Sequence, residues 1–292
     1  MLYLVGLLRT KQWIKNGLLF FPILFNVNGP HLLFTEPHLQ HIGLVFIGFI
    51  IFNFASGASY IINDILDISR DILHPIKKSR PIASGAIRPV WGGGLAISLI
   101  IGTIICAYLL DQTFALFLAF YLLISLGYSI RFKHMFFLDI MFVASGYVLR
   151  FLAGASIIGF SSSVAMLLSI FLIAMYISLS KRRAEITLLG EKAAIHRPSL
   201  KIYSFKFIDG LMLILVPTIG LVYAYYLFGE QPYNHYSSIT FIVFIMGILR
   251  YLYLTYNSIL VGSPEDVFIR DRPLVVFLVF WVVAASINPN IR

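Results

Sequence analysis

The sequence predicts an all-α fold: a polytopic membrane bundle of nine transmembrane helices, built as one domain over residues 1–292. Apolar residues make up 59% of the chain and charged residues only 12%, a balance far outside that of soluble globular domains. Apolar stretches of about 20 residues recur, the length that an α-helix needs to cross a bilayer. The connections between these stretches alternate between basic and non-basic. Together these observations exclude a soluble protein, and no separate soluble domain is visible.

The nine expected spans are apolar runs of helix-spanning length. They cover residues 14–33, 41–63, 91–110, 113–130, 136–158, 162–180, 208–228, 238–257 and 273–289. The segment from Met1 to Leu8 is apolar ahead of any positive charge, which is the wrong order for a cleaved signal peptide. A short interfacial helix that runs into Arg9 and Trp13 is expected instead. The single cysteine, Cys106, excludes an internal disulfide.

The charges of the connections predict the orientation of the bundle. Basic residues fall before the first span and in every second connection, whereas the other connections carry the acids Glu36, Asp111 and Glu230. The positive-inside rule then places the N-terminus and the basic connections in the cytoplasm, as in a multi-pass plasma-membrane protein. This topology accounts for much of the net charge of +9, and no nucleic-acid-binding module is visible. We therefore expect no nucleic-acid partner, and a homo-oligomer is left open.

Three carboxylates cluster where the second span leaves the membrane. Asp64, Asp67 and Asp71 stand at i, i+3 and i+7, positions that share one face of a helix. They would repel one another, and the C-terminal end of a helix disfavours their charge. A bound divalent cation would remove both penalties, and Mg²⁺ prefers oxygen ligands that it can share with substrate phosphates. The bases Lys77 and Arg80 follow in a loop and are expected to meet phosphate groups.

Further polar residues lie at membrane depth, where they usually face a cavity or another helix. The second span ends with Tyr60 and Asn63, close to the aspartates. Arg150 lies well inside the fifth span, three helical turns from Asp139 on the same face. Two interpretations of this pair stay open: a role in binding an anionic ligand, or a structural ion pair. The same two interpretations apply to Arg250 in the eighth span.

Two basic connections carry further candidates for binding an anionic substrate. They are Tyr128 and Lys133 after the fourth span, and Lys181, Arg182, Arg183 and Glu185 after the sixth. Topology alone explains several of these bases, and a closure over an anionic substrate is the alternative. In that alternative Glu185 would orient a base or accept a hydrogen bond from a hydroxyl group. The mixed charges of residues 263–273 are interpreted as a solvated loop.

At residues 63–81 the sequence resembles the UbiA superfamily of intramembrane prenyltransferases. The first motif of that superfamily, Asn-Asp-x-x-Asp-x-x-x-Asp, is matched by Asn63, Asp64, Asp67 and Asp71. The count of nine spans agrees with the superfamily over almost the whole chain. The resemblance implies a UbiA-like helical bundle with a cytoplasm-facing active-site cavity. It also implies Mg²⁺ bound by these four residues and a diphosphate leaving group.

One departure narrows the resemblance. Aromatic prenyltransferases of the superfamily carry a second Asp-rich motif after the sixth span, where this chain has the basic segment 180–185 with a single acid. The chain is similar instead to the decaprenyl-phosphate phosphoribosyltransferase branch. The stretches that carry this similarity are 9–16, 74–85, 181–185 and 264–266.

This branch implies Mg²⁺-dependent transfer of 5-phosphoribosyl from phosphoribosyl diphosphate to a polyprenyl phosphate in the synthesis of a cell-envelope glycolipid precursor. The lipid phosphate, already an anion, would attack C1 of the ribose, and diphosphate would leave with its charge stabilised by Mg²⁺. The residues expected to take part in catalysis are Asp64, Asp67, Asp71, Lys133 and Glu185. Those expected to bind substrate are Lys15, Tyr60, Asn63, Lys77, Arg80, Tyr128, Asp139, Arg150, Lys181, Arg182 and Arg183.

Two other functions are weighed against this one. A prenyltransferase that moves a prenyl group from a prenyl diphosphate to an aromatic or other small acceptor would use the same first motif, but it should carry a second acidic site. A transporter would also place charges within the membrane. Against transport, no inverted repeat is visible, and the acidic cluster lies at an interface rather than at the midplane.

Overall fold

The computed structural model describes residues 6–25, 36–190, 203–230 and 234–287, and every regular element within these residues is helical. Seven helices are long and apolar enough to cross a membrane. They are α3 (Glu36–Leu66), α5 (Pro89–Leu110), α6 (Gln112–Ile130), α7 (Leu138–Ile157), α8 (Val164–Leu189), α10 (Phe205–Ala224, continued by the π-helical η7, Tyr225–Gly229) and α11 (His235–Asn257).

The remaining elements are shorter. They are η1 (Thr10–Phe20), α2 (Phe21–Phe25), α4 (Ile68–Leu73), η3 (Lys77–Ser79), η4 (Phe132–His134), η8 (Ile259–Gly262), α12 (Pro264–Arg270) and α13 (Arg272–Ile287). The η1–α2 segment and the 16-residue α13 occupy the first and ninth expected spans. The all-helical class is confirmed, and seven of the nine expected spans are helices of membrane-spanning length, with ends that differ by a few residues. Residues 26–33 and 288–289 of those spans lie outside the described residues.

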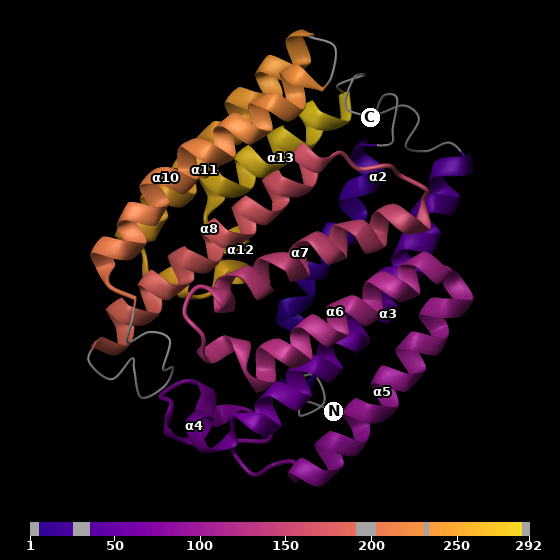
Figure 1. The fold of residues 1–292 in the computed structure, drawn as a ribbon, viewed down its shortest axis with the longest axis vertical. Helices are drawn as coiled ribbons and strands as arrows, with labels where there is room; N and C mark the ends of the chain where they lie inside the picture. The colour runs from indigo at the N-terminus through magenta and orange to yellow at the C-terminus, as the bar shows by residue number, and fades with distance from the viewer. Residues whose placement is uncertain (1–5, 26–35, 191–202, 231–233, 288–292) are drawn as a thin grey trace.

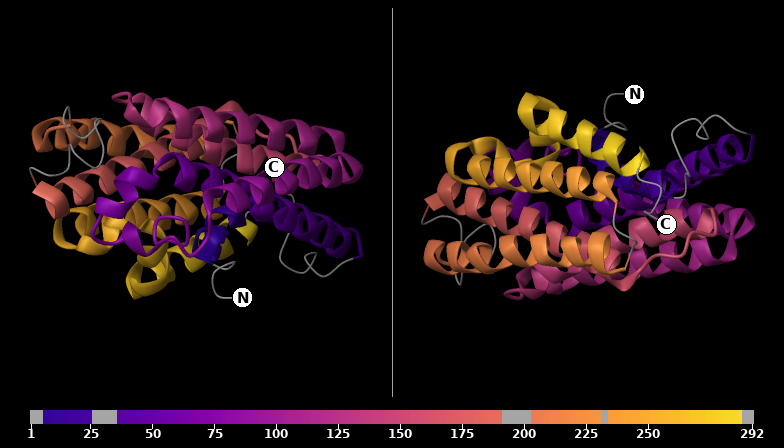
Figure 2. Two further views of the ribbon diagram at one scale, coloured as in Figure 1. Left: turned by 90° about the horizontal axis from the view of Figure 1, so that it is seen from below. Right: turned by 90° about the horizontal axis from the view of Figure 1, so that it is seen from above.

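The long helices form one bundle in which neighbours along the chain pack against one another (Figure 1). The helix pairs in contact are α3 with α5 and α6, α6 with α7, α7 with α8, α8 with α10, and α11 with α13. Viewed from below and from above, the long helices run side by side along a common direction (Figure 2). The segment η1 contacts both α3 and α7, so it joins the first half of the bundle from inside.

One end of the bundle gathers the connections that carry basic residues, and we call it the basic end. It holds α4 and η3 after α3, η4 after α6, and α12 after α11. Ion pairs tie these connections to one another: Lys133 of η4 lies 2.7 Å from Asp67 beside α4, and Lys15 of η1 lies 3.7 Å from Glu265 of α12. The sequence candidates for function therefore converge at this end.

The first expected span does not begin as an ordinary α-helix. Residues Thr10–Phe20 form an 11-residue 3₁₀ helix, longer than the three or four residues usual for this form. Its C-terminal part packs backbone against backbone on α7, where a Cβ atom at Gly154 would clash with the Leu19 carbonyl group. Glycine is therefore required at this crossing, because it alone lets the two backbones approach so closely.

This close approach yields a stability prediction. Gly154→Ala should lower the free energy of unfolding by about 1–3 kcal/mol, the usual cost of overpacking. The control is Gly102→Ala on α5, where the added Cβ would meet nothing within 4 Å. Thermal unfolding in detergent measures both variants. An unchanged Gly154→Ala protein would mean that η1 is not held against α7 as described.

Candidate active site

The aspartate run is interrupted at its middle residue. Helix α3 ends at Leu66, Asp67 leaves the helical conformation with φ −103° and ψ 8°, and α4 starts at Ile68. The expectation that Asp64, Asp67 and Asp71 share one face of a continuous helix is therefore wrong. The break divides the carboxylates into two sets with different partners, which relieves the repulsion that a continuous face would impose.

Asp64 and Asp71 share one arginine. The Arg80 guanidinium lies 3.0 Å from the Asp64 carboxylate and 2.5 Å from that of Asp71. Arg9 makes a second ion pair with Asp64 and lies over the Tyr60 ring, 5.0 Å from its centroid. Both carboxylates are buried. Burial and the nearby Arg9 charge lower the pKa of Arg80 below its ordinary value, and the two aspartates oppose that shift.

Asp67 has a base of its own. The Lys133 ammonium donates to Asp67 over 2.7 Å and to the Asn63 side-chain oxygen over 3.3 Å. Lys133 belongs to η4, so this contact joins the connection after α6 to the end of α3. Arg70 reaches the same carboxylate at 3.6 Å and lies 2.9 Å from the His134 ring. We call Asn63, Asp64, Asp67 and Asp71, together with their bases, the carboxylate cluster.

The carboxylate cluster contains the oxygen ligands that a divalent metal ion prefers, but its charges are already paired. Within the described part of the chain, no three acidic, histidine or cysteine side chains converge on one point that could hold a metal. The bases Arg80 and Lys133 bind the carboxylates instead. One oxygen is nevertheless orphaned: Asp64 Oδ2 is buried and has no hydrogen-bond partner among the described residues. An oxygen donor set with such an orphan fits Mg²⁺, provided that the bases release the other oxygens.

A second polar cluster joins η1 to α8 and α12, and we call it the lysine cluster. It contains Gln12, Lys15, Lys181 and Glu265. Lys15 donates to the Gln12 side-chain oxygen, and Gln12 in turn donates to Glu265 over 2.5 Å. Lys15 lies 3.7 Å from Glu265, and the charge of Lys181 also acts on this carboxylate.

The lysine cluster keeps its carboxylate ionised. Glu265 is only 8% exposed. Burial alone would raise the pKa of Glu265, but the charges of Lys15 and Lys181 outweigh it, so this pKa lies below its ordinary value. Glu265 was expected in a solvated loop, and this interpretation is wrong. The helix α12 folds back onto η1 and buries Glu265 against Gln12.

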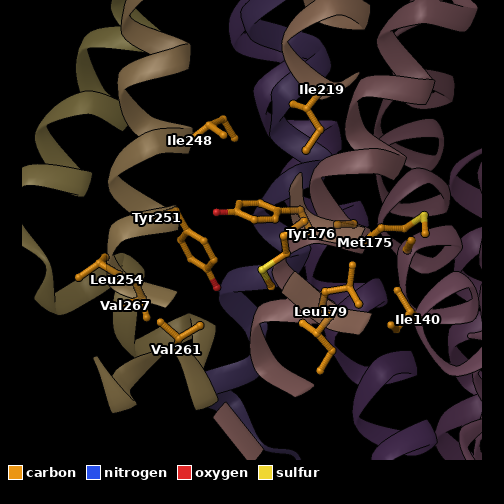
Figure 3. Packing of buried hydrophobic residues seen from close by; sticks show 14 of the residues in the cluster. Ile140, Met175, Tyr176, Leu179, Ile219, Ile248, Tyr251, Leu254, Val261 and Val267 are labelled. Carbon is orange, nitrogen blue, oxygen red and sulfur yellow. The ribbon is translucent and has the colours of Figure 1, made fainter. Parts of the chain in front are cut away.

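An apolar chamber of about 450 Å³ begins at the lysine cluster. It lies between η1, α2, α8, α11 and α13, and Lys15 and Glu265 are the charged side chains among its described lining residues. Apart from Ser169, the other lining residues are apolar or aromatic. Tyr176 of α8 and Tyr251 of α11 meet in it edge to face, with ring centroids 5.6 Å apart (Figure 3). From Met166 to Ile177 the lining residues follow α8 over about 16 Å. Such a chamber suits a long hydrocarbon group.

The three consecutive bases of α8 point in different directions, and only Lys181 belongs to the lysine cluster. Arg182 is buried and binds both Asp139, at 3.1 Å, and Glu185. Arg183 pairs with Asp209 of α10 at 2.9 Å. Successive residues of a helix are about 100° apart, so three adjacent bases cannot close together over one ligand.

Arg150 is held by neutral groups. Its guanidinium donates to the Asn16 side chain over 2.6 Å and to the Tyr121 hydroxyl over 3.0 Å. It also lies over the Tyr121 ring, 4.7 Å from the centroid. Asp139, the expected ion-pair partner, binds Arg182 and accepts from the Tyr203 hydroxyl over 2.7 Å. The structural interpretation of an Arg150–Asp139 pair is wrong, because eleven residues of helix separate the two side chains.

Other candidates have more local roles. Tyr128 lies near enough to Arg182 to act on it electrostatically. Lys77 begins η3, and its backbone N–H donates to the His74 ring over 3.3 Å. Arg250 binds Asp271 through two hydrogen bonds of 3.1 and 2.8 Å, which supports its structural interpretation.

Four residues of the two clusters were not among the predicted site residues: Arg9, Gln12, Arg70 and Glu265. Arg9 was counted as a topological charge and Glu265 as part of a charged loop, and the similarity of the stretches 9–16 and 264–266 gave neither residue a role. A signal was present in the spacing. Arg9, Gln12 and Lys15 recur every third residue, which is the repeat of a 3₁₀ helix rather than of an α-helix.

The chain matches the model of the UbiA prenyltransferase family over residues 19–268. It is 30% identical over 285 residues to the decaprenyl-phosphate phosphoribosyltransferase of Corynebacterium glutamicum, which covers 96% of this chain and 84% of that protein. The protein of the same name from Mycobacterium tuberculosis is 29% identical over 284 residues, 97% of this chain and 92% of that protein.

The fold is similar to solved structures as well. A UbiA homologue from Archaeoglobus fulgidus bound to DMAPP and Mg²⁺ superposes with a TM-score of 0.74 at 19% identity, over 98% of this chain and 99% of that chain. The same homologue bound to GPP and Mg²⁺ gives a TM-score of 0.73 at 20% identity, over 97% and 99%. This likeness confirms the expected UbiA-like helical bundle.

The lowered pKa of Glu265 predicts a pH-dependent stability. A carboxyl group whose pKa is lowered by folding stabilises the fold above its unfolded pKa, and this contribution is lost as the pH falls through the lowered value. Wild-type protein should therefore be more stable than Glu265→Gln at pH 7, and the difference should shrink below about pH 4. Thermal unfolding across pH 7 to 3 measures it. A constant difference would contradict the described ion pairs.

Proposed function

The chain belongs to the UbiA prenyltransferase family of membrane enzymes, and on that basis we propose that it transfers 5-phosphoribosyl from phosphoribosyl diphosphate to a polyprenyl phosphate. The observation that carries the proposal is the presence of two charged clusters beside one apolar chamber. The carboxylate cluster suits a metal-bound diphosphate, and the lysine cluster suits a lipid phosphate whose chain enters the chamber. The names of the relatives from C. glutamicum and M. tuberculosis support this transferred group and this kind of acceptor.

The bases of the carboxylate cluster would bind the donor. Arg80 holds two carboxylates through one guanidinium nitrogen, and its planar guanidinium group can bind phosphate oxygens equally well. Lys133 and Lys77 would add point charges to the same group. Because Arg80 and Lys133 can exchange a carboxylate for a phosphate, binding of the donor would free the aspartates for the metal.

Asn63, Asp64, Asp67 and Asp71 would hold Mg²⁺, in agreement with the orphaned Asp64 oxygen. When bound, the ion would neutralise charge that develops on the leaving diphosphate. The solved structures of the A. fulgidus homologue with Mg²⁺ support divalent-metal dependence.

The lysine cluster and the chamber would bind the acceptor. The Lys15 and Lys181 ammonium groups would bind the lipid phosphate, and the first isoprene units would bury apolar surface between α8, α11 and α13. Tyr60 lies between this cluster and the donor site, in contact with Arg9 and close enough to act on Lys15. The two substrates would therefore meet at Tyr60.

The reaction requires little acid–base chemistry from the protein. An oxygen of the lipid phosphate forms a bond to C1 of the ribose, the bond from C1 to the diphosphate oxygen breaks, and its electron pair leaves with the diphosphate. The attacking phosphate is already an anion, so no base is required. Glu185, oriented by Arg182, would accept hydrogen bonds from the ribose hydroxyls.

The chain is a multi-pass membrane protein. We place it in the plasma membrane with the basic end in the cytoplasm, because positive charges are retained on that side. There the enzyme would meet a soluble phosphorylated sugar and supply a glycolipid precursor of the cell envelope.

The choice of donor can be tested directly. Purified protein with Mg²⁺ and a polyprenyl phosphate should release diphosphate from phosphoribosyl diphosphate and form polyprenyl phosphoribose, as followed by mass spectrometry. A parallel reaction would offer a prenyl diphosphate with an aromatic acceptor. Diphosphate released only from the prenyl donor would contradict the proposal and favour the aromatic prenyltransferase.

The metal role of Asp67 gives a second test. Asp67→Asn should abolish turnover and leave the amount of folded protein nearly unchanged, because this side chain is partly exposed and the asparagine oxygen can still accept a hydrogen bond from Lys133. Glu230→Gln, the matched amide substitution of an exposed acid at the opposite end, should keep full activity. Near-normal turnover of Asp67→Asn would refute the metal role.

A further inference from the structure

A single face of η1 lines the route from the carboxylate cluster to the apolar chamber. Side chains three residues apart eclipse one another on a 3₁₀ helix. Arg9, at the N-cap, reaches Asp64, whereas Gln12 and Lys15 reach Glu265. Further along the same face, Leu18 lines the chamber. The lysine cluster therefore occupies the point where a polar passage becomes apolar.

At this point the carboxylate of Glu265 is unexpected. Two ammonium groups alone would make the better site for an anionic head group, yet a buried carboxylate lies 3.7 Å from one of them. Its negative charge offsets part of the positive charge of the two lysines. Glu265 lines the chamber. Its Oε2 atom is buried without a hydrogen-bond partner among the described residues. Because this buried carboxylate would weaken the binding of an anionic head group, affinity for that group does not explain its presence.

Selectivity between anionic head groups of different charge does explain it. A fixed negative charge repels every anionic head group, but the repulsion grows with the charge of the head group. A lipid diphosphate carries more charge than a lipid monophosphate and is larger, so it would be repelled more strongly. Discrimination between similar ligands commonly depends on such a repulsive element.

We propose that Glu265 is a specificity-determining residue that makes the lysine cluster accept a lipid phosphate monoester and reject a lipid diphosphate. This inference rests on the proposed lipid-phosphate acceptor. It adds a residue that excludes prenyl diphosphates from the chamber, where their chains would otherwise fit as well as that of the acceptor. Glu265 acts through charge and does not touch the reacting atoms.

The test compares binding of farnesyl phosphate and farnesyl diphosphate, which share one hydrocarbon chain. Binding to the detergent-solubilised full chain is measured by calorimetry without donor. Wild-type protein should prefer the monophosphate. Glu265→Gln should shift the ratio of the two dissociation constants toward the diphosphate by about tenfold, because one repelling charge is removed. Glu265→Asp, which keeps the charge, should retain the wild-type preference.

The control is Asp266→Asn, the same change of charge one residue further along α12, where the side chain faces Arg270 at 3.9 Å. Its ratio should equal that of wild-type protein. Glu265→Ser provides a second neutral variant in case Glu265→Gln is recovered poorly. A purely structural role of Glu265 would weaken both ligands together and leave the ratio unchanged, which would overturn the inference.

Binding and turnover separate this inference from the proposed function. Wild-type protein that prefers the diphosphate, or that binds neither lipid, would overturn the role of Glu265. Wild-type protein that shows the expected preference but transfers no phosphoribosyl group would refute the proposed function and leave the role of Glu265 standing. In the turnover assay, Glu265→Gln should become about tenfold more sensitive to inhibition by farnesyl diphosphate than wild-type protein.

Discussion

Each acid in the interior of the basic end is balanced by a base from another segment, and the rest of this region depends on that pairing. Arg80 joins its loop to α3 through Asp64, Lys133 joins η4 to α3 through Asp67, and Lys15 joins η1 to α12 through Glu265. A charge left alone at such a depth would cost several kcal/mol, so none of these segments could leave without its partner. These ion pairs therefore hold the segments of this region together, and they also determine which charged groups are available to substrates.

The same pairing explains how a resting site of this kind could take up substrates. In the carboxylate cluster, the negative carboxylates are paired with positive bases of the protein. A donor with its metal brings negative phosphates and a positive ion. Phosphates can take the bases, and the metal can take the aspartates. The number of compensated charges stays nearly constant during this exchange, which keeps the cost of opening the cluster low.

The features that the sequence predicted correctly are those that depend on local composition and residue spacing. Span length and loop charge locate the nine segments, and the spacing from Asn63 to Asp71 locates the carboxylate cluster. The break at Asp67 was missed, and so was the contact of Asp67 with Lys133, because that partner lies far along the chain. Glu265 was missed for a similar reason: a charged loop looks solvated until α12 is seen to pack on η1. The divergence of Arg182 and Arg183 follows from helix geometry, whereas their partners Asp139 and Asp209 are known only from the packing of α7 and α10 on α8.

The 3₁₀ conformation of η1 determines how far this segment extends along its axis. From Arg9 to Leu18 the chain rises about 18 Å at the 3₁₀ pitch, whereas an α-helix of the same residues would rise about 13.5 Å and would turn their side chains to different faces. The distance between the donor site and the chamber is therefore set by the number of η1 residues between them. Relatives that gained or lost one residue here would lose the alignment of both ends, so length changes in this segment should occur in steps of three.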